Sequence, residues 1–306
     1  MRLVFAGTPA AAVPTLRRLA TSHDIAAVVT RPDAALGRRR VLTPSPVAQA
    51  ALELGLPVIK AARLDDAATA EIAALEVELG VIVAYGGLVR EPLLSMPTRG
   101  WINLHFSLLP AWRGAAPVQR ALIAGDDVLG ASVFQLVAEL DAGDVYATRE
   151  IEVAETATAG EALETLAHDG ADLTAQVVDA IADGTADARP QVGEPSFAAK
   201  LSHADGLLDW NAPLDTVFAR FRGATPEPGA HTTVGGQALK VLEAVPAADA
   251  EPLAPGRFRG TKKALLIGTG SGALAVTRVQ PAGKGAMNAV DWWRGQRGGD
   301  ELQAGS

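Results

Sequence analysis

Residues 65–86 read DDAATAEIAALEVELGVIVAYG, and the pattern changes in the middle of this stretch. Before the change, Ile72, Leu75 and Leu79 recur at helical spacing, which predicts a helix from residue 65 to Leu79. The run at Gly80–Ala84 is then continuously apolar, which is typical of a strand buried on both faces. A helix that leads into such a strand predicts a unit of an α/β fold.

The same alternation extends through the first part of the chain. Apolar runs alternate there with stretches of helical spacing: Arg2–Ala6, Val13–Thr21, Ile25–Thr30 and Pro46–Leu54. We therefore expect a Rossmann-like parallel sheet with helices on both faces. In open sheets of this kind the site lies beyond the carboxyl ends of the strands. This rule places Gly7, Tyr85 and Gly86 on the functional edge.

The composition limits the class of protein. A chain of 306 residues with 48% hydrophobic residues is long enough for two cores. Cysteine is absent, which excludes disulfides, thiolate metal sites and cysteine nucleophiles, and the five histidines lack the short spacing of a helical zinc motif. No stretch approaches the ~18 consecutive apolar residues of a membrane span, and no signal peptide is recognisable. We expect a cytoplasmic protein with no metal and no membrane partner.

The pattern of apolar residues changes after the first half of the sequence. A helical stretch at about 160–182 precedes residues 185–205, which have no steady period and are predicted to form a linker. Beyond it, short strand-like runs are separated by glycine and proline, which favours a small β-barrel. The predicted division is 1–184, 185–205 and 206–306.

Charge is distributed unevenly along the chain. The net charge is −8, yet residues 252–297 hold eight Lys or Arg residues against the single acid Asp291. A basic C-terminal region on an acidic protein indicates a polyanionic partner. The charge distribution is equally compatible with a solvated basic face that binds no partner.

The most informative stretch is WINLHFSLLPAWRGAAPVQ at residues 101–119. On a strand, Asn103 and His105 fall on one face, about 7 Å apart. Both side chains can hydrogen-bond a carbonyl oxygen, although a buried histidine with an ordinary core role would look the same. The strand is predicted to end in a loop formed by Ser107, Leu108, Leu109 and Pro110.

Two acids flank a glycine in the stretch LDAGDV at residues 140–145. An ordinary Asp-Gly turn explains this pattern. The functional interpretation is that one of the acids, Asp141 or Asp144, meets His105, orients the ring and raises its pKa.

Several segments together resemble the folate-dependent formyltransferases, nearly from end to end. The segments are FAGTP at 5–9, VAYG at 83–86, NLHFSLLP at 103–110, RGAAP at 113–117 and DAGD at 141–144. The resemblance implies formyl transfer from 10-formyltetrahydrofolate, with residues 1–184 as catalytic domain. It implies that Asn103 and His105 stabilise the oxyanion and that Asp141 holds His105 and assists proton transfer. The folate pocket would comprise Tyr85, Gly86, Asp144 and the loop Ser107, Leu108, Leu109 and Pro110.

The later segments LSHADGLLDW at 201–210 and QPAGKGAM at 280–287 are similar to the members that act on a charged tRNA. The resemblance then implies that the acceptor is the α-amine of methionine esterified to initiator tRNA. A basic loop containing Arg38, Arg39 and Arg40 would enter the acceptor stem. Residues 206–306 would form an OB-like tRNA-binding barrel with Lys284 on its basic surface, and we expect a monomer.

Three alternatives remain at this point. A related formyltransferase would act on a small amine, such as glycinamide ribonucleotide or an amino sugar, but would not need the basic C-terminal region. An RNA-binding protein without activity would not need Asn103, His105 and Asp141. A folate-dependent hydrolase would release formate without an acceptor amine.

Overall fold

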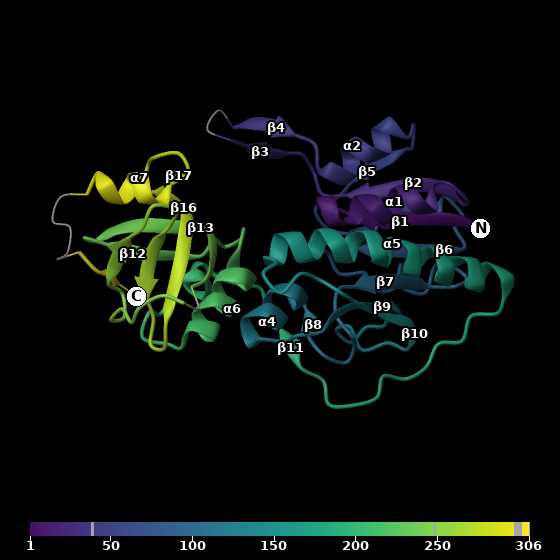
Figure 1. The fold of residues 1–306 in the computed structure, drawn as a ribbon. Coiled ribbons are helices and arrows are strands. Elements are labelled where there is room, and N and C mark those ends of the chain that lie inside the picture. Colours follow the sequence, from purple (N-terminus) through teal and green to yellow (C-terminus); the bar gives the residue numbers. More distant parts are fainter. Residues whose placement is uncertain (38–39, 248, 297–301, 306) are drawn as a thin grey trace. The chain divides into compact units, whose positions relative to one another are not determined.

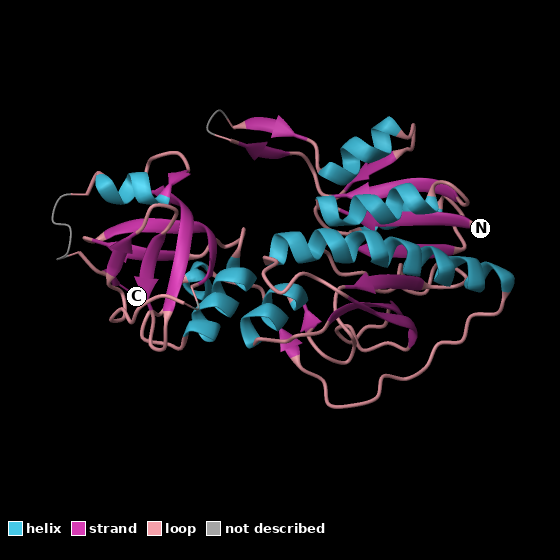
Figure 2. Ribbon diagram, viewed as in Figure 1, coloured by secondary structure: helices cyan, strands magenta, loops and turns pink. Residues whose placement is uncertain are grey.

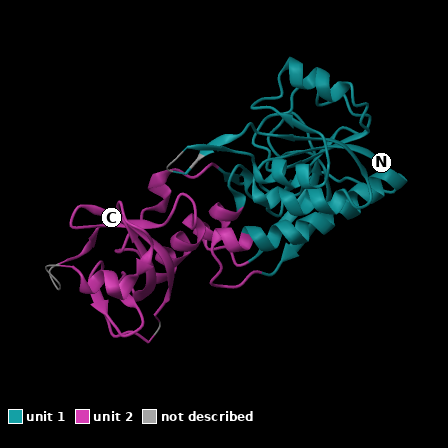
Figure 3. Ribbon diagram, turned by 90° about the horizontal axis from the view of Figure 1, so that it is seen from above, with its two compact units in different colours: residues 1–117, 128–152, 163–198 teal, residues 118–127, 153–162, 199–306 magenta. Residues whose placement is uncertain are grey.

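The structure is a computed structural model that describes residues 1–37, 40–247, 249–296 and 302–305. Contacts within the chain group it into two compact units, coloured separately in Figure 3. The first unit comprises residues 1–117, 128–152 and 163–198, and the second comprises 118–127, 153–162 and 199–306. The division at 184 and 205 stays a prediction about domains.

The first unit is built on a seven-stranded sheet in the order β10-β9-β7-β6-β1-β2-β5. Its strands are β1 (Arg2–Gly7), β2 (Asp24–Thr30), β5 (Val58–Lys60), β6 (Leu79–Val83), β7 (Trp101–His105), β9 (Leu129–Gln135) and β10 (Val145–Ile151). The five strands from β7 to β5 are parallel, and β9 and β10 add an antiparallel edge. The predicted Rossmann-like parallel sheet is therefore confirmed.

Helices pack on both faces of this sheet, and Figures 1 and 2 show the helical layer on one of them. The helices of this part of the chain are η1 (Ala10–Ala12), α1 (Val13–Leu19), α2 (Pro46–Glu53), α3 (Asp66–Ala73) and α5 (Ala159–Asp183). On one face, Trp101 of β7 shares a buried cluster with Ile72 of α3. On the other face, Leu104 of β7 lies against Gly170 of α5. An ion pair between Arg18 and Asp172 (3.0 Å) joins α1 to α5. Alternate residues of β7 thus face opposite layers.

The helix predicted to run to Leu79 is shorter than expected. Asp65 caps its first turn by accepting a hydrogen bond from the Ala68 N–H (3.0 Å), but α3 ends at Ala73. Glu76 has φ 49°, a left-handed conformation that no helix continues through. Leu79 consequently belongs to β6, where it is fully buried.

The predicted linker is tied to the first unit over residues 185–198. Arg189 and Val145 exchange backbone hydrogen bonds, with N–O distances of 2.8 and 3.0 Å. Two further residues form a short parallel pair between β8 (Arg113–Gly114) and β11 (Phe197–Ala198). Residues 185–198 therefore lie along the first unit rather than forming a free connector.

The basic stretch at 31–40 carries a small hairpin. Its arms are β3 (Ala34–Leu36) and β4 (Val41–Thr43), which pair antiparallel. Lys60 of β5 donates to the Asp33 carboxylate (2.8 Å) at the base of the hairpin. Figure 1 shows the hairpin extending away from the parallel sheet.

The second unit contains an antiparallel sheet in the order β14-β15-β16-β13-β12-β18, with β17 paired to β16. Its elements are α4 (Pro117–Ala124, which begins in the first unit), η2 (His203–Gly206), α6 (Leu214–Ala224), β12 (His231–Val234), β13 (Gln237–Pro246), β14 (Phe258–Gly260), β15 (Leu265–Gly268), β16 (Ala273–Pro281), β17 (Met287–Asn288), α7 (Ala289–Arg294) and β18 (Ala304–Gly305). A bridge between Arg257 and Gln303, next to β14 and β18, joins the two ends of the sheet. The sheet thus curls into the predicted OB-like barrel, around a core that includes Trp210 and Phe221.

Candidate active site

The carboxyl end of β7 carries the two polar side chains predicted for the site. Asn103 and His105 alternate with Ile102 and Leu104, so they share one face of the strand. The Asn103 Oδ1 atom is buried and has no hydrogen-bond partner within the part of the chain that is described. A buried amide oxygen of this kind is costly unless a ligand group or water satisfies it.

His105 is 5% exposed and is fixed by a backbone group. Its Nε2 lies 2.8 Å from the carbonyl oxygen of Trp112, and because a carbonyl only accepts, Nε2 carries the proton. Burial lowers the pKa of the ring, and the Asp141 charge and the Trp112 hydrogen bond oppose this effect. The predicted raised pKa is therefore wrong in its net direction, because burial outweighs the acid.

Asp141 approaches His105 but is not hydrogen-bonded to it. Its Oδ2 lies 3.8 Å from Nδ1 of His105 and accepts a hydrogen bond from the Gly114 N–H (2.8 Å). The side chain is largely buried, and its backbone has φ 46°. Gly143 is required in this turn, since a Cβ there would lie 1.8 Å from the Gln135 carbonyl oxygen.

The loop after β7 is held by one buried hydroxyl. Ser132 of β9 donates to the carbonyl of Ser107 (2.7 Å) and accepts from the Leu109 N–H (3.1 Å). Ser107 in turn donates its hydroxyl to the Ala111 carbonyl (2.6 Å). The predicted loop Ser107, Leu108, Leu109 and Pro110 therefore has a fixed backbone beside His105, the residue that pairs with Ser132 in the sheet.

The turn after β6 exposes its backbone rather than its aromatic ring. The Tyr85 side chain is 1% exposed and donates to the Ala61 carbonyl (2.8 Å), and burial raises its pKa. Gly86 has φ 77° and accepts a hydrogen bond from the Arg31 guanidinium. A ligand at this turn would meet the backbone and Arg31, because the Tyr85 ring lies in the core.

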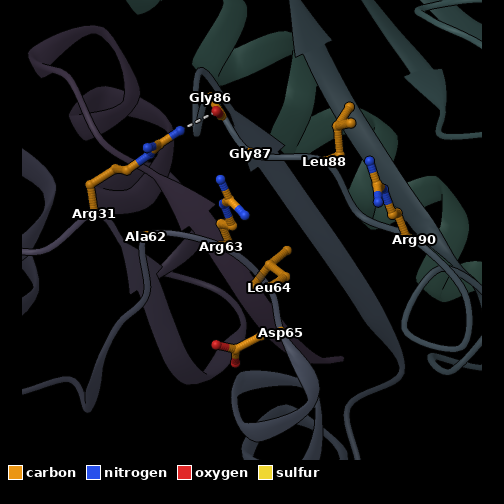
Figure 4. Close-up of a pocket in the computed structure, with 9 residues that line it drawn as sticks. All are labelled: Arg31, Ala62, Arg63, Leu64, Asp65, Gly86, Gly87, Leu88 and Arg90. Atoms are coloured by element: carbon orange, nitrogen blue, oxygen red, sulfur yellow. Dashed lines mark hydrogen bonds between the residues drawn. The ribbon is translucent and has the colours of Figure 1, made fainter.

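An arginine-lined pocket of about 660 Å³ opens beside this turn. Figure 4 shows the guanidinium groups of Arg31, Arg63 and Arg90 around one opening, with the Asp65 carboxylate set apart from them. The Asp65 carboxylate also accepts the capping hydrogen bond of α3. A cavity with three guanidinium groups suits a ligand that carries carboxylates.

Sequence reasoning did not assign Arg63 and Arg90 to a site. Arg63 follows β5 and Arg90 follows β6, so both lie at the carboxyl edge of the sheet. Sites in such sheets lie beyond this edge, so a search for charged residues directly after the predicted strands would have found both arginines.

The remaining predicted residues are less closely tied to the site. Asp144 is exposed, its carbonyl accepts from the Gln135 N–H (2.8 Å), and its charge adds to burial in raising the pKa of Tyr146. Arg38 and Arg39 lie outside the described residues, whereas Arg40 is exposed in the turn of the β3-β4 hairpin. Lys284 is exposed in the second unit.

The basic region of the second unit is partly neutralised. Three of its arginines pair with acids at 3.2–3.3 Å: Arg259 with Glu251, Arg278 with Glu243 and Arg294 with Asp291. Lys262 and Lys263 are exposed in the turn between β14 and β15. The basic surface is therefore smaller than the count of charges predicts, and its exposed lysines are its best candidates for anion binding.

Metal-ligand clusters and membrane-spanning helices are both absent from the part of the chain that is described. Across those residues, no group of three or more His, Asp or Glu side chains is arranged to hold a metal ion. Of the helices described, none is both long enough and apolar enough to cross a membrane.

Comparison with known proteins assigns both halves of the chain to families. The formyl transferase family matches residues 1–178, and the family described as formyl transferase, C-terminal domain, matches residues 200–297. A methionyl-tRNA formyltransferase of Clavibacter sepedonicus is 60% identical over 296 residues, which cover 96% of this chain and 97% of that protein. One of Leifsonia xyli subsp. xyli is 59% identical over 298 residues, covering 97% and 98%.

Solved structures share the fold at low sequence identity. The structure of the N-formyltransferase from Helicobacter canadensis, in complex with folinic acid and dTDP-3-aminofucose, has a TM-score of 0.66. It is 15% identical and covers 91% of this chain and 98% of that chain. This likeness concerns the fold alone.

Proposed function

Because this chain belongs to the formyl transferase family, we propose that it transfers the formyl group of 10-formyltetrahydrofolate to the α-amine of methionyl initiator tRNA. The product is N-formylmethionyl-tRNA for translation initiation. The proposal is supported by relatives of that name that match almost the whole chain at about 60% identity. We also propose a cytoplasmic location and a monomeric state.

The observation that carries the catalytic part is the arrangement at the end of β7. Asn103 offers a side-chain amide whose buried Oδ1 has no partner among the described residues, next to His105 on the same strand face. Asp141 lies 3.8 Å from the other nitrogen of that ring. An amide, an imidazole and a carboxylate at one sheet edge match the needs of acyl transfer to an amine.

The chemistry follows from the charges that develop. Attack of the amine on the formyl carbon places negative charge on the formyl oxygen and positive charge on the attacking nitrogen. Asn103 and the Nε2–H of His105 donate to that oxygen, the latter by exchanging the Trp112 carbonyl for it. Asp141 takes up the proton that the amine loses, directly or through His105. The tetrahedral intermediate then collapses by breaking the bond between the formyl carbon and N10 of tetrahydrofolate, and N10 leaves with that proton.

The donor fits the groups at the carboxyl edge. Tetrahydrofolate ends in a glutamate, and Arg31, Arg63 and Arg90 line a pocket that suits its carboxylates. The backbone at Tyr85 and Gly86 and the loop Ser107–Pro110 then border the rest of the folate. Asp144 stays in the proposed folate wall on the strength of the family resemblance.

The acceptor is proposed from the basic residues. Arg38, Arg39 and Arg40 belong to the stretch with the β3-β4 hairpin, which we assign to the acceptor end of the tRNA. Lys284 is assigned to the backbone of the same tRNA, through phosphate contacts. A formyltransferase for a small amine is disfavoured, because the family match includes the C-terminal domain and the named relatives act on methionyl-tRNA.

The test of the catalytic assignment separates chemistry from binding. We expect His105→Ala and Asp141→Asn to reduce formyl transfer by at least about 100-fold, with tRNA binding retained. The measurements are single-turnover transfer at saturating substrates and filter binding of methionyl-tRNA. Activity retained by both variants would contradict the assignment.

A further inference from the structure

The side chain of Gln191 connects the predicted linker to the turn that carries Asp141. Its Nε2 donates to the carbonyl of Asp141 (2.8 Å) and to the carbonyl of Gly143 (2.9 Å). Its Oε1 accepts from Nη2 (2.7 Å) and Nε (3.2 Å) of Arg113. All these residues belong to the first unit.

The orientation of this amide is determined by its partners. A guanidinium only donates, so the amide oxygen must face Arg113. The two backbone carbonyls only accept, so the amide nitrogen must face Asp141 and Gly143. A glutamate at position 191 would keep the contact with Arg113 and lose both donations.

The contacts form a closed ring around the carboxylate. Arg113 holds Gln191, Gln191 holds the backbone of Asp141, and Asp141 Oδ2 accepts from the N–H of Gly114, the neighbour of Arg113. The Arg113 side chain is 12% exposed and lies 3.7 Å from Glu139. Asp141 adopts φ 46°, a left-handed conformation that Asp tolerates better than most residues and that the contacts of this ring hold in place.

The same segment also supports the partner of His105. The Ser196 hydroxyl accepts from the Trp112 N–H (2.9 Å), and the Trp112 carbonyl accepts from His105 Nε2 (2.8 Å). Residues 189–198 therefore contact the backbone on both sides of the His105–Asp141 pair. A residue that orients a catalytic group in this way commonly contributes to rate without touching the substrate.

On this geometry, and on the proposed function, we propose that Gln191 is a positioning residue that holds Asp141 beside His105 for proton transfer. Gln191 binds neither donor nor acceptor. Its loss therefore lowers kcat and leaves the substrate KM values nearly unchanged.

The test uses two substitutions with different charge. Gln191→Glu and Gln191→Met both remove the amide donations, and only the first adds a charge. We expect kcat for formyl transfer to fall about 10- to 100-fold in both, with KM for each substrate changed less than about 3-fold. The matched control is Gln176→Glu, since Gln176 of α5 also accepts from an arginine, Arg149 (3.1 Å), at an exposed position. It should leave kcat unchanged.

Two further measurements distinguish positioning from a folding defect. In the Asp141→Asn background, Gln191→Met should add no further loss, because its effect passes through the Asp141 carboxylate. Hydrogen exchange of the Gly114 amide, whose N–H donates to Asp141, should accelerate in both Gln191 variants of the protein without substrate.

The outcomes are separable. An unchanged kcat, or a full additional loss in the Asp141→Asn background, would overturn the positioning role. Unchanged exchange at Gly114 in both variants would show that Gln191 does not hold Asp141 in place. If the wild-type protein transfers nothing to methionyl-tRNA, the proposed function fails. The exchange measurement still decides whether Gln191 holds Asp141 in place.

Discussion

His105 donates to a backbone carbonyl, and Asp141 accepts from a backbone amide, at 2.8 Å in both cases. The two side chains are thus oriented by two different backbone groups, at Trp112 and Gly114, and Nδ1 of His105 lies 3.8 Å from Oδ2 of Asp141. Catalytic hydrogen bonds are often long before substrate binds. The proposed mechanism therefore requires the pair to close when the amine binds.

The pKa of His105 predicts a pH dependence of stability. Burial lowers this pKa below its usual 6.5, so the folded ring binds fewer protons than the unfolded one. This contribution is complete above the unfolded pKa and is lost as pH falls through the window between the unfolded and folded values. The free energy of unfolding should therefore decrease from about pH 7.5 to about pH 5.5.

Urea denaturation at several pH values measures this dependence. Because His105→Asn cannot titrate, its free energy of unfolding should decrease less over the same range. The decrease will not vanish, since burial also lowers the pKa of His23. Parallel curves for the wild type and His105→Asn would contradict the lowered pKa.

The arginine pocket gives a second prediction for single residues. Arg63→Glu and Arg90→Glu should raise KM for 10-formyltetrahydrofolate at least about 10-fold, through loss of pairing with the glutamate carboxylates. A donor analogue without the glutamate should show no such difference between wild type and variants. Arg189→Glu, at an 81% exposed side chain outside the pocket, is the control. Equal effects on both donors would exclude the pocket from tail binding.

At the scale of elements, the turn between β9 and β10 depends on one glycine. A Cβ at Gly143 would lie 1.8 Å from a backbone oxygen that cannot move without β9. We expect Gly143→Ala to lower the free energy of unfolding by about 1–3 kcal/mol and to reduce formyl transfer, because Asp141 shares the turn. At Gly285 a Cβ would meet nothing within 4 Å, so Gly285→Ala should leave stability unchanged. Denaturation curves that coincide for both variants would contradict the close packing.

The same elements show what could be predicted from the sequence. Continuous apolar runs located the parallel strands, and alternation placed Asn103 and His105 on one face, since both patterns are local. The early end of α3 depends on the backbone of Glu76, which no periodicity reveals. Gln191 was missed because its segment has no period and its partners lie about 50 residues away, at Asp141 and Gly143.

At the scale of the molecule, a basic surface belongs to an acidic chain of net charge −8. We expect the affinity for methionyl-tRNA to fall steeply with salt, since phosphate contacts release counterions. The double substitution Lys262→Glu and Lys263→Glu should make the slope of log affinity against log salt concentration less steep. Charge reversal at Arg38–Arg40 should weaken the binding of tRNA more than the binding of folate. Binding titrations at several salt concentrations measure both effects. A slope near zero would contradict tRNA binding through phosphate contacts.

The most direct test is the reaction itself. Purified protein is incubated with 10-formyltetrahydrofolate and charged initiator methionyl-tRNA, and N-formylmethionyl-tRNA is quantified, with free methionine, glycinamide ribonucleotide and an amino sugar nucleotide as alternative acceptors. Product is expected from the charged tRNA and from none of the other three acceptors. Transfer to a small amine, with none to the tRNA, would contradict this expectation.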